Sequence, residues 1–203
     1  DIFDREAVFL EKVLGPMRSD FPDLKIVLEH ITTADSVAFV QSAGANTAAT
    51  ITPHHLRIDR NALFDGGMRP HAYCLPVAKR AHHRTALRQA AVSGDPKFFL
   101  GTDSAPHPRK DKESDCGCAG IFCAPAALES YALTFDEEGA LDKLEGFASE
   151  FGPRFYGLPL NEGTITLKRD DFAVPDAITG KDLSVVPFHA GETLKWRAMD
   201  RAA

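Results

Sequence analysis

The sequence predicts an α/β fold built on parallel strands. In residues 1–110, short apolar runs rich in β-branched residues alternate with segments of helical periodicity. Each apolar run also ends in a polar residue that is capable of metal or acid–base chemistry. Because the carboxyl ends of parallel strands meet at one face of a sheet or barrel, these polar residues are expected to form a site there.

The first helix and strand place a histidine at that face. Asp4 is a suitable N-cap for a helix that is expected to end at the breaker pair Gly15–Pro16. The next run, residues 25–31 (Lys-Ile-Val-Leu-Glu-His-Ile), is typical of a buried parallel strand. His30 lies at its C-terminal end.

Two more strand-and-helix units follow. Residues 33–43 predict a helix, and residues 48–53 a second buried strand that leads to His54 and His55. After a glycine-rich loop, residues 79–93 predict a helix with Gly94 as its C-cap. Residues 98–103 (Phe-Phe-Leu-Gly-Thr-Asp) predict the third strand, which ends in Asp103.

The rest of the chain lacks this alternation. A single domain over residues 1–203 is predicted, with strand–helix units in 1–110 and a loop, helices and a tail in 111–203. Helices are expected near 125–135 and 138–151, and short strand-like pieces at 164–167 and 185–188. Three strands cannot close a barrel, which usually takes about 250 residues. Together with a first residue that is not Met, this indicates a segment preceding Asp1.

Composition excludes several classes of protein. The 203 residues are 44% hydrophobic and 26% charged, which is typical of a globular protein with a substantial core. A net charge of −6 argues against nucleic-acid binding. No apolar run is long enough for a membrane span, and the acidic N-terminus is unlike a signal peptide. The four cysteines are expected to be reduced thiols, and the protein to be cytoplasmic.

His30 and Asp103 are the candidate metal ligands. An isolated Asp after a strand is more often a turn or N-cap residue. Asp103, however, ends one strand just as His30 ends another, and this favours ligation of a cation such as zinc. Two ligands are too few for a complete site, so the others must come from elsewhere.

Other candidates have plainer explanations. Adjacent side chains on a strand point in opposite directions, so His54 and His55 are expected to have surface or capping roles. Cys116, Cys118 and Cys123 could bind a soft metal, but a glycine-rich loop holding small buried thiols is the simpler interpretation. Glycines there would allow backbone amides to approach a substrate.

Five motifs occur in order along the chain: Glu29–Thr33 (EHITT), Ile51–Leu56 (ITPHHL), Arg69–Pro76 (RPHAYCLP), Gly101–His107 (GTDSAPH) and Cys116–Gly120 (CGCAG). Together they resemble the homodimeric bacterial dihydroorotases of the amidohydrolase superfamily. The resemblance covers nearly the whole chain.

This resemblance implies the C-terminal part of a (β/α)8 TIM barrel that holds two zinc ions. It implies that His30 and Asp103 bind zinc and that Asp103 is the general base and acid. It further implies that His107 contacts the substrate carboxylate, and that the backbones of Leu75 and Ala119 hydrogen-bond the pyrimidine ring. The reaction implied is the reversible cyclisation of N-carbamoyl-L-aspartate to L-dihydroorotate in pyrimidine biosynthesis, by a homodimer.

The chain departs from the family pattern because the His-x-His pair and the bridging lysine belong to earlier strands that are absent from the sequence. The chain alone is therefore expected to be inactive. Two alternatives stay open: a hydantoinase or allantoinase, which shares the binuclear site, and a non-catalytic truncated subunit that binds a partner.

Overall fold

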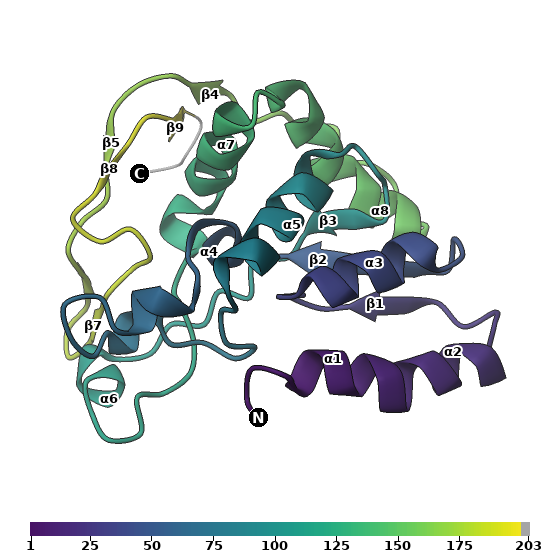
Figure 1. Ribbon diagram of the computed structural model, residues 1–203. Helices are drawn as coiled ribbons and strands as arrows, with labels where there is room; N and C mark the ends of the chain where they lie inside the picture. The colour runs from purple at the N-terminus through teal and green to yellow at the C-terminus, as the bar shows by residue number, and fades with distance from the viewer. Residues whose placement is uncertain (200–203) are drawn as a thin grey trace.

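A three-stranded parallel sheet forms the centre of the computed structural model, which describes residues 1–199 (Figure 1). The strands β1 (Ile26–Leu28), β2 (Thr47–Ile51) and β3 (Phe98–Leu100) lie side by side in sequence order. The sequence predicted a strand at each of the three apolar runs, and the structure confirms all three strands. Every residue of the middle strand, β2, is buried, as expected of a parallel strand covered on both faces.

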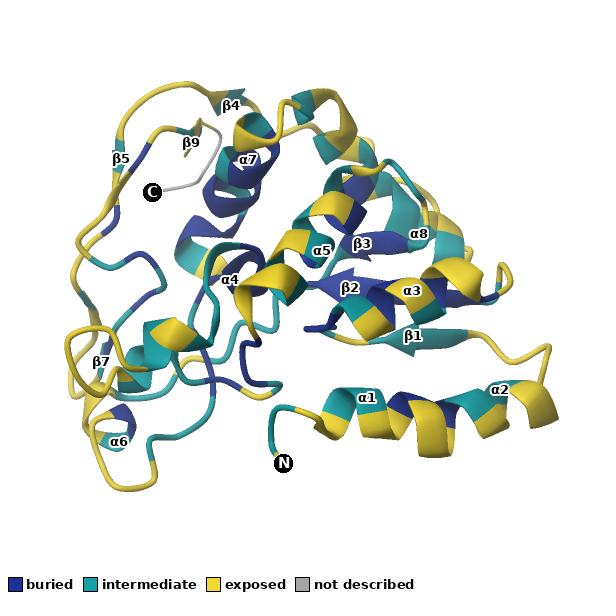
Figure 2. Cartoon of the chain, viewed as in Figure 1, coloured by how far each residue is buried: buried dark blue, intermediate teal, exposed yellow. Residues whose placement is uncertain are grey.

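Helices α3 (Ala34–Ser42) and α5 (Ala81–Val92) cover one face of this sheet and complete two βαβ units (Figure 1). The Thr33 side chain caps α3 by accepting a hydrogen bond from the Ser36 N–H. The inward-facing sides of the helices are dark blue in Figure 2, so each helix buries one stripe of apolar residues against the sheet. The members of this core include Val37, Val40, Ala49, Leu87, Ala90, Phe98, Tyr131 and Phe135.

The N-terminal helix differs from its prediction. It continues past Gly15–Pro16, through α1 (Arg5–Phe9), a π-helical segment η1 (Leu10–Leu14) and α2 (Gly15–Asp20). Pro16 lies in the first turn of α2, where its missing N–H costs little, and the wider π-helical segment before it accommodates the interruption. Asp4 precedes α1, but its side chain makes no capping hydrogen bond.

Glu6 of α1 joins this helix to the loop after β1 and to the start of α3. Its carboxylate accepts hydrogen bonds from the backbone N–H groups of Thr32 and Thr33, each at 2.9 Å, and from the Ser36 hydroxyl at 2.6 Å. Burial alone would raise the pKa of Glu6, but the hydrogen bonds from Ser36, Thr32 and Thr33 outweigh it and lower the pKa. The carboxylate also lies at the positive N-terminal end of α3.

We expect Glu6→Ala to lower the free energy of unfolding by about 2 kcal/mol, because two buried backbone donors lose their acceptor. Urea unfolding measures this change. Glu11→Ala, an exposed acidic position on the same helical segment, is the matched control and should shift it by less than about 0.5 kcal/mol. Equal effects of the two substitutions would contradict the role of Glu6.

The second half of the chain packs helices and short ladders against this core. Tyr131 of α7 (Ala127–Glu137) donates from its hydroxyl to the Ile51 carbonyl at 2.7 Å. The helix predicted at 138–151 is instead a succession of short segments, η5 (Leu141–Lys143), η6 (Gly146–Glu150) and α8 (Phe151–Tyr156).

The tail was predicted to contain strand-like pieces, and the structure has shorter strands there, of two residues each, in antiparallel pairs. The antiparallel pairs are β4 (Leu167–Lys168) with β9 (Arg197–Ala198), β5 (Phe172–Ala173) with β8 (Thr193–Leu194) and β6 (Ile178–Thr179) with β7 (Ser184–Val185). Short helical segments complete the description: α4 (Pro53–Arg57), η2 (Arg60–Leu63), η3 (Pro70–Ala72), α6 (Arg109–Lys112) and η4 (Ala124–Ala126).

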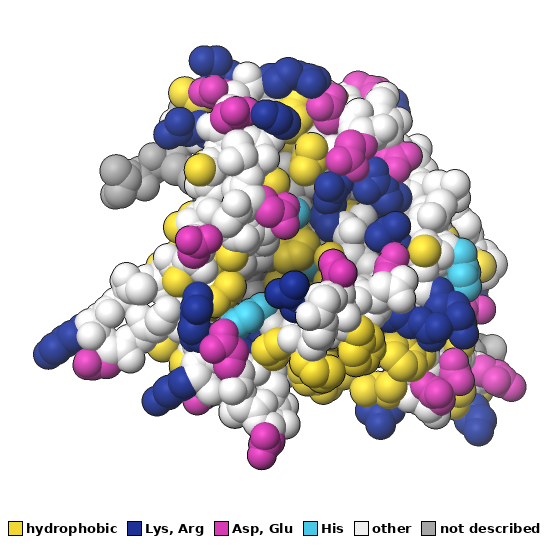
Figure 3. All heavy atoms as spheres, turned by 60° about the vertical axis from the view of Figure 1, so that its left-hand side comes forward, with side chains coloured by type: hydrophobic (Ala, Val, Ile, Leu, Met, Phe, Trp, Pro, Cys, Tyr) yellow, Lys and Arg dark blue, Asp and Glu magenta, His cyan; other side chains and the backbone are white. Residues whose placement is uncertain are grey.

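Neither edge of the sheet is paired with a further strand in the described chain. Within residues 1–199, β1 and β3 each pair only with β2, and a cleft of about 460 Å³ lies between β1 and the N-terminal helix. Figure 3 shows hydrophobic side chains gathered low on one face of the molecule, with charged groups around them. Exposed apolar residues of the N-terminal helical segment are Val8, Phe9, Val13 and Met17. No helix in the described part of the chain is long and apolar enough to cross a bilayer.

Candidate active site

The C-terminal ends of β1 and β3 bring His30 and Asp103 together. The His30 Nε2 lies 3.9 Å from Asp103 Oδ1, and the two side chains are 23% and 30% exposed. Both residues have positive φ, 57° for His30 and 41° for Asp103, a conformation that non-glycine residues adopt rarely and at a cost of about 1–3 kcal/mol. Such strain at two strand ends, with the side chains facing one another, is typical of a functional site.

Thr50 of β2 lies between these two strand ends and orients the imidazole. Its Oγ1 accepts the His30 N–H at 2.7 Å, donates to Glu29 Oε2 at 2.8 Å and lies 3.3 Å from His30 Nδ1. Since the single hydroxyl proton goes to Glu29, the oxygen is free to accept from an Nδ1–H. That tautomer leaves the Nε2 lone pair facing Asp103.

The arrangement fits a divalent metal. In the tautomer with the proton on Nδ1, the lone pair of the His30 Nε2 faces the carboxylate of Asp103, and the Glu29 Oε2 lies 3.6 Å from the same nitrogen. Nitrogen and carboxylate oxygen together suit zinc. Glu29 and Thr50 were missed by the sequence analysis. Glu29 could have been found as the acid directly before His30, and Thr50 as the polar residue inside a buried strand.

Gly101 makes this arrangement possible by its lack of a side chain. A Cβ at position 101 would lie 2.4 Å from the Cβ of Thr50 and 2.8 Å from its Oγ1. Real Cβ atoms do not approach so closely, so a larger residue would displace the hydroxyl that holds His30.

The other predicted site residues lie on segments that contact each other. The His107 Nε2 lies 3.1 Å from the carbonyl oxygen of Ala119. Because a carbonyl oxygen can only accept a hydrogen bond, Nε2 carries the donated proton. The Gly120 N–H donates to the Tyr73 carbonyl at 3.0 Å, which joins the Ala119 segment to the chain just before Leu75. Leu75 itself is half-exposed, 48%, and precedes a cis bond to Pro76.

Gly120 lies against His107 closely enough to make a sharp prediction. An added Cβ would be 2.8 Å from the His107 Nε2 and 2.7 Å from the Ala105 Cβ, at a φ of +154°. We expect Gly120→Ala to lower the free energy of unfolding by about 2 kcal/mol, through backbone strain and displacement of His107. Gly163→Ala has open space around its Cβ and is the control. Urea titration of both variants measures the difference; two unchanged midpoints would contradict the packing described.

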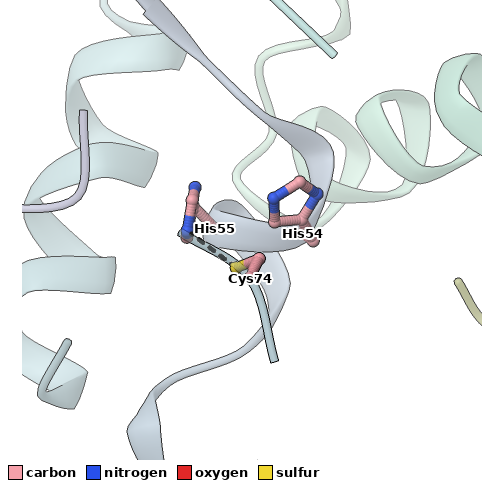
Figure 4. Close-up of side chains that lie close together, drawn as sticks. All are labelled: His54, His55 and Cys74. Atoms are coloured by element: carbon pink, nitrogen blue, oxygen red, sulfur yellow. Dashed lines mark hydrogen bonds between the residues drawn. The ribbon is translucent and has the colours of Figure 1, made fainter. Parts of the chain in front are cut away.

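The prediction that His54 and His55 have surface or capping roles is wrong, since both are buried, at 0% and 2% exposure. The strand ends at Ile51, and Pro53 starts helix α4, which turns both imidazoles into the interior. With Cys74 they place ligand-type atoms within 4.8 Å of one another (Figure 4).

This His54, His55 and Cys74 group is a poor metal site in chemical terms. The His55 Nδ1 is 2.7 Å from the Thr52 hydroxyl and Nε2 is 2.9 Å from the Pro76 carbonyl, so neither nitrogen has a free lone pair. Burial raises the pKa of the Cys74 thiol to about 12, which disfavours the thiolate that binds metals. Within the described residues, neither ring nitrogen of His54 has a hydrogen-bond partner.

The three cysteines of the glycine-rich loop do not form one cluster. Cys116 is exposed and its Sγ lies 3.6 Å from that of Cys118, whereas Cys123 is buried and donates to the Thr102 carbonyl at 3.1 Å. Burial raises the pKa of Cys123 to about 11. The interpretation of small buried thiols therefore holds for Cys123 and not for Cys116.

Comparison with known proteins shows that the chain is similar to dihydroorotases. No family model matches the sequence, but the dihydroorotase of Sphingopyxis alaskensis is 68% identical over 197 residues, 97% of the chain. The chain is homologous to dihydroorotases. It spans 57% of the length of that relative, and the match supports the interpretation as the C-terminal portion of a dihydroorotase.

Solved dihydroorotases have the same fold. The enzyme of Campylobacter jejuni is 38% identical, with a TM-score of 0.89 over 98% of the chain and 58% of its own. The enzyme of Saccharomyces cerevisiae, in complex with 5-fluoroorotic acid, is 36% identical, with a TM-score of 0.88 over the whole chain and 59% of its own. An L-hydantoinase of Arthrobacter aurescens, 21% identical, has a similar fold, with a TM-score of 0.67 over 86% of the chain and 43% of its own. The predicted α/β barrel class, of which the chain forms a part, is thereby confirmed.

Proposed function

We propose that the chain is the C-terminal portion of a zinc-dependent dihydroorotase and supplies one side of its active site. The proposed reaction is the reversible cyclisation of N-carbamoyl-L-aspartate to L-dihydroorotate. The observation that carries the proposal is the pairing of His30 with Asp103, 3.9 Å apart at the carboxyl end of the sheet, in a chain homologous to dihydroorotases. The high identity to proteins of that name favours this activity over that of a hydantoinase or allantoinase.

In this proposal His30 and Asp103 would hold metal. Zinc, when bound, would lower the pKa of a water molecule and polarise the carbonyl of the ring amide. His30 presents Nε2 because Thr50 fixes its other nitrogen. Asp103 takes up the proton of the attacking water during ring opening and returns it to the ring nitrogen that leaves. In ring closure the same carboxylate works in reverse.

The substrate is proposed to lie between the strand ends and the loop around Ala119. The His107 imidazole would contact its carboxylate, and the backbones of Leu75 and Ala119 would hydrogen-bond its ring. The fluorinated pyrimidine bound by the yeast enzyme supports a pyrimidine-like ligand. Two zinc ions for each complete site, a homodimer and a cytoplasmic location complete the proposal.

The test uses a full-length protein, meaning this chain joined to the segment that its longer relatives have in addition. Supplied with zinc, it should hydrolyse dihydroorotate and cyclise N-carbamoyl-aspartate, while hydantoin and allantoin should be poor substrates. The chain alone should be inactive, because two ligands do not complete a catalytic zinc site. Failure of the zinc-loaded full-length protein to turn over either pyrimidine precursor would overturn the proposal and favour a non-catalytic binding role.

A further inference from the structure

Lys112 has a buried ammonium group whose hydrogen bonds all go to backbone oxygens, and which also lies 5.7 Å from the centre of the Tyr73 ring. The residue lies at the end of α6 and is 3% exposed. Its Nζ donates to the carbonyls of Tyr73 at 2.8 Å, Cys118 at 2.7 Å and Gly120 at 2.8 Å. An ammonium group has three N–H donors, so all three are used. Among the described residues, no carboxylate forms an ion pair with it.

Such a group is costly to bury. Taking an ammonium out of water without a counter-charge is unfavourable unless hydrogen bonds compensate, and burial here lowers the pKa of Lys112 to about 8. An apolar residue would avoid that cost but would leave the three carbonyls without the hydrogen bonds that Nζ donates. The lysine therefore ties these carbonyls together, which an apolar side chain could not do.

The three carbonyls belong to two segments separated in sequence. Tyr73 precedes Leu75 by two residues, and Cys118 and Gly120 flank Ala119. The Tyr73 carbonyl also accepts the Gly120 N–H, at 3.0 Å, so the segments meet at the ammonium group. Lys112 thus binds both stretches of backbone that are proposed to contact the pyrimidine ring.

The loop needs such a restraint. Gly117, Cys118 and Gly120 have positive φ values of 65°, 23° and 154°. Glycine adopts positive φ readily, but a non-glycine residue such as Cys118 persists there only when its surroundings hold it. Because two of the three hydrogen bonds of Nζ end within this strained stretch, loss of the ammonium would release it.

We propose that Lys112 is a positioning residue for substrate binding: it fixes the backbones around Leu75 and Ala119 at the spacing that the ring requires. The identity of the ligand in this proposal rests on the proposed function. The restraint of the two backbone segments by Lys112 does not depend on it. An arginine is a poor substitute, since a planar guanidinium cannot direct three donors to carbonyls on different sides.

The first test measures amide hydrogen exchange in the full-length protein. Lys112→Met should speed exchange of the Gly120 amide and its neighbours in 113–123 at least about tenfold, while α7 keeps its protection. Lys110→Met, an exposed lysine on the same helix, is the matched control and should leave exchange unchanged. Should Lys112→Met fail to fold, Lys112→Arg replaces it, with faster exchange in the same segment expected. Unchanged exchange in the folded variant would overturn the restraint.

The second test separates binding from chemistry. In the full-length protein, Lys112→Met should raise the KM for dihydroorotate about tenfold, with kcat within about threefold of wild type, since Lys112 orders the binding segments and touches no reacting atom. An equal fall in kcat with unchanged KM would overturn the positioning role. If the wild-type and Lys110→Met proteins are both inactive, the proposed function fails, whereas the exchange result still decides whether Lys112 restrains the loop.

Discussion

Asp103→Ala in the full-length protein should reduce turnover of dihydroorotate by about 10³-fold or more while the fold is retained. The substitution removes the carboxylate that faces His30 at 3.9 Å and is proposed both to hold metal and to transfer the proton. General acid–base catalysis alone contributes roughly 10²–10⁴-fold. Steady-state kinetics with saturating zinc measure the loss, and circular dichroism checks the fold.

The control and a second variant make this result specific. Asp20→Ala removes an exposed carboxylate on α2 and should leave turnover unchanged. Asp103→Asn keeps the size of the side chain but cannot take up the proton, so it should be nearly as inactive as the alanine variant. Wild-type rates in Asp103→Ala would refute the assignment of this residue, whatever the metal content of the protein.

A marked loss of stability in mild acid is the second large effect we expect. Burial lowers the pKa of His55 from 6.5 to about 4, against the raising effect of its hydrogen bond to the Pro76 carbonyl. Burial, followed by the charges of His55 and His30, lowers the pKa of His54 well below 6.5. Both side chains are therefore neutral in the folded protein at pH 7.

The sign of the effect follows from proton uptake. Below pH 6.5 the unfolded chain binds protons that the folded protein excludes, so the free energy of unfolding falls as pH falls. For His55 the loss is complete near pH 4 and amounts to about 3 kcal/mol, and His54 adds to it. Above pH 6.5 neither histidine contributes to the pH dependence.

Urea unfolding at a series of pH values between 7.5 and 4 measures this dependence. His54→Gln has no titrating group and removes a side chain whose nitrogens lack partners, so the slope of stability against pH should become shallower. His82→Gln, exposed on α5, should keep the wild-type slope. An identical slope in all three proteins would show that His54 does not take up a proton on unfolding.

Local pattern was enough to predict the strands, and it placed His30 and Asp103 correctly at their ends. A run of β-branched residues by itself predicts a buried strand. A polar residue at the end of such a run is expected to lie at the carboxyl end of the sheet. The face of the parallel sheet then follows from general rules of α/β folds.

What the pattern could not predict depends on contacts between distant segments. The burial of His54 and His55 follows from a helix that starts at Pro53, whereas alternation along a strand would have separated them. The first helix continues through Gly15 by way of the π-helical segment Leu10–Leu14, in which Leu10 and Leu14 are buried. Lys112 lies close in the sequence to exposed charged residues, and only the folded positions of the Tyr73 and Gly120 carbonyls account for its burial.

The close approach of Gly101 to Thr50 couples the evolution of two strands. Any side chain at 101 would need room that only a smaller residue at 50 provides. Thr50→Gly would supply that room but delete the hydroxyl that holds Glu29 and His30. A lineage that keeps the His30 imidazole facing Asp103 therefore has no viable single step, or simple pair of steps, away from glycine at 101. We expect the two positions to be retained together or lost together.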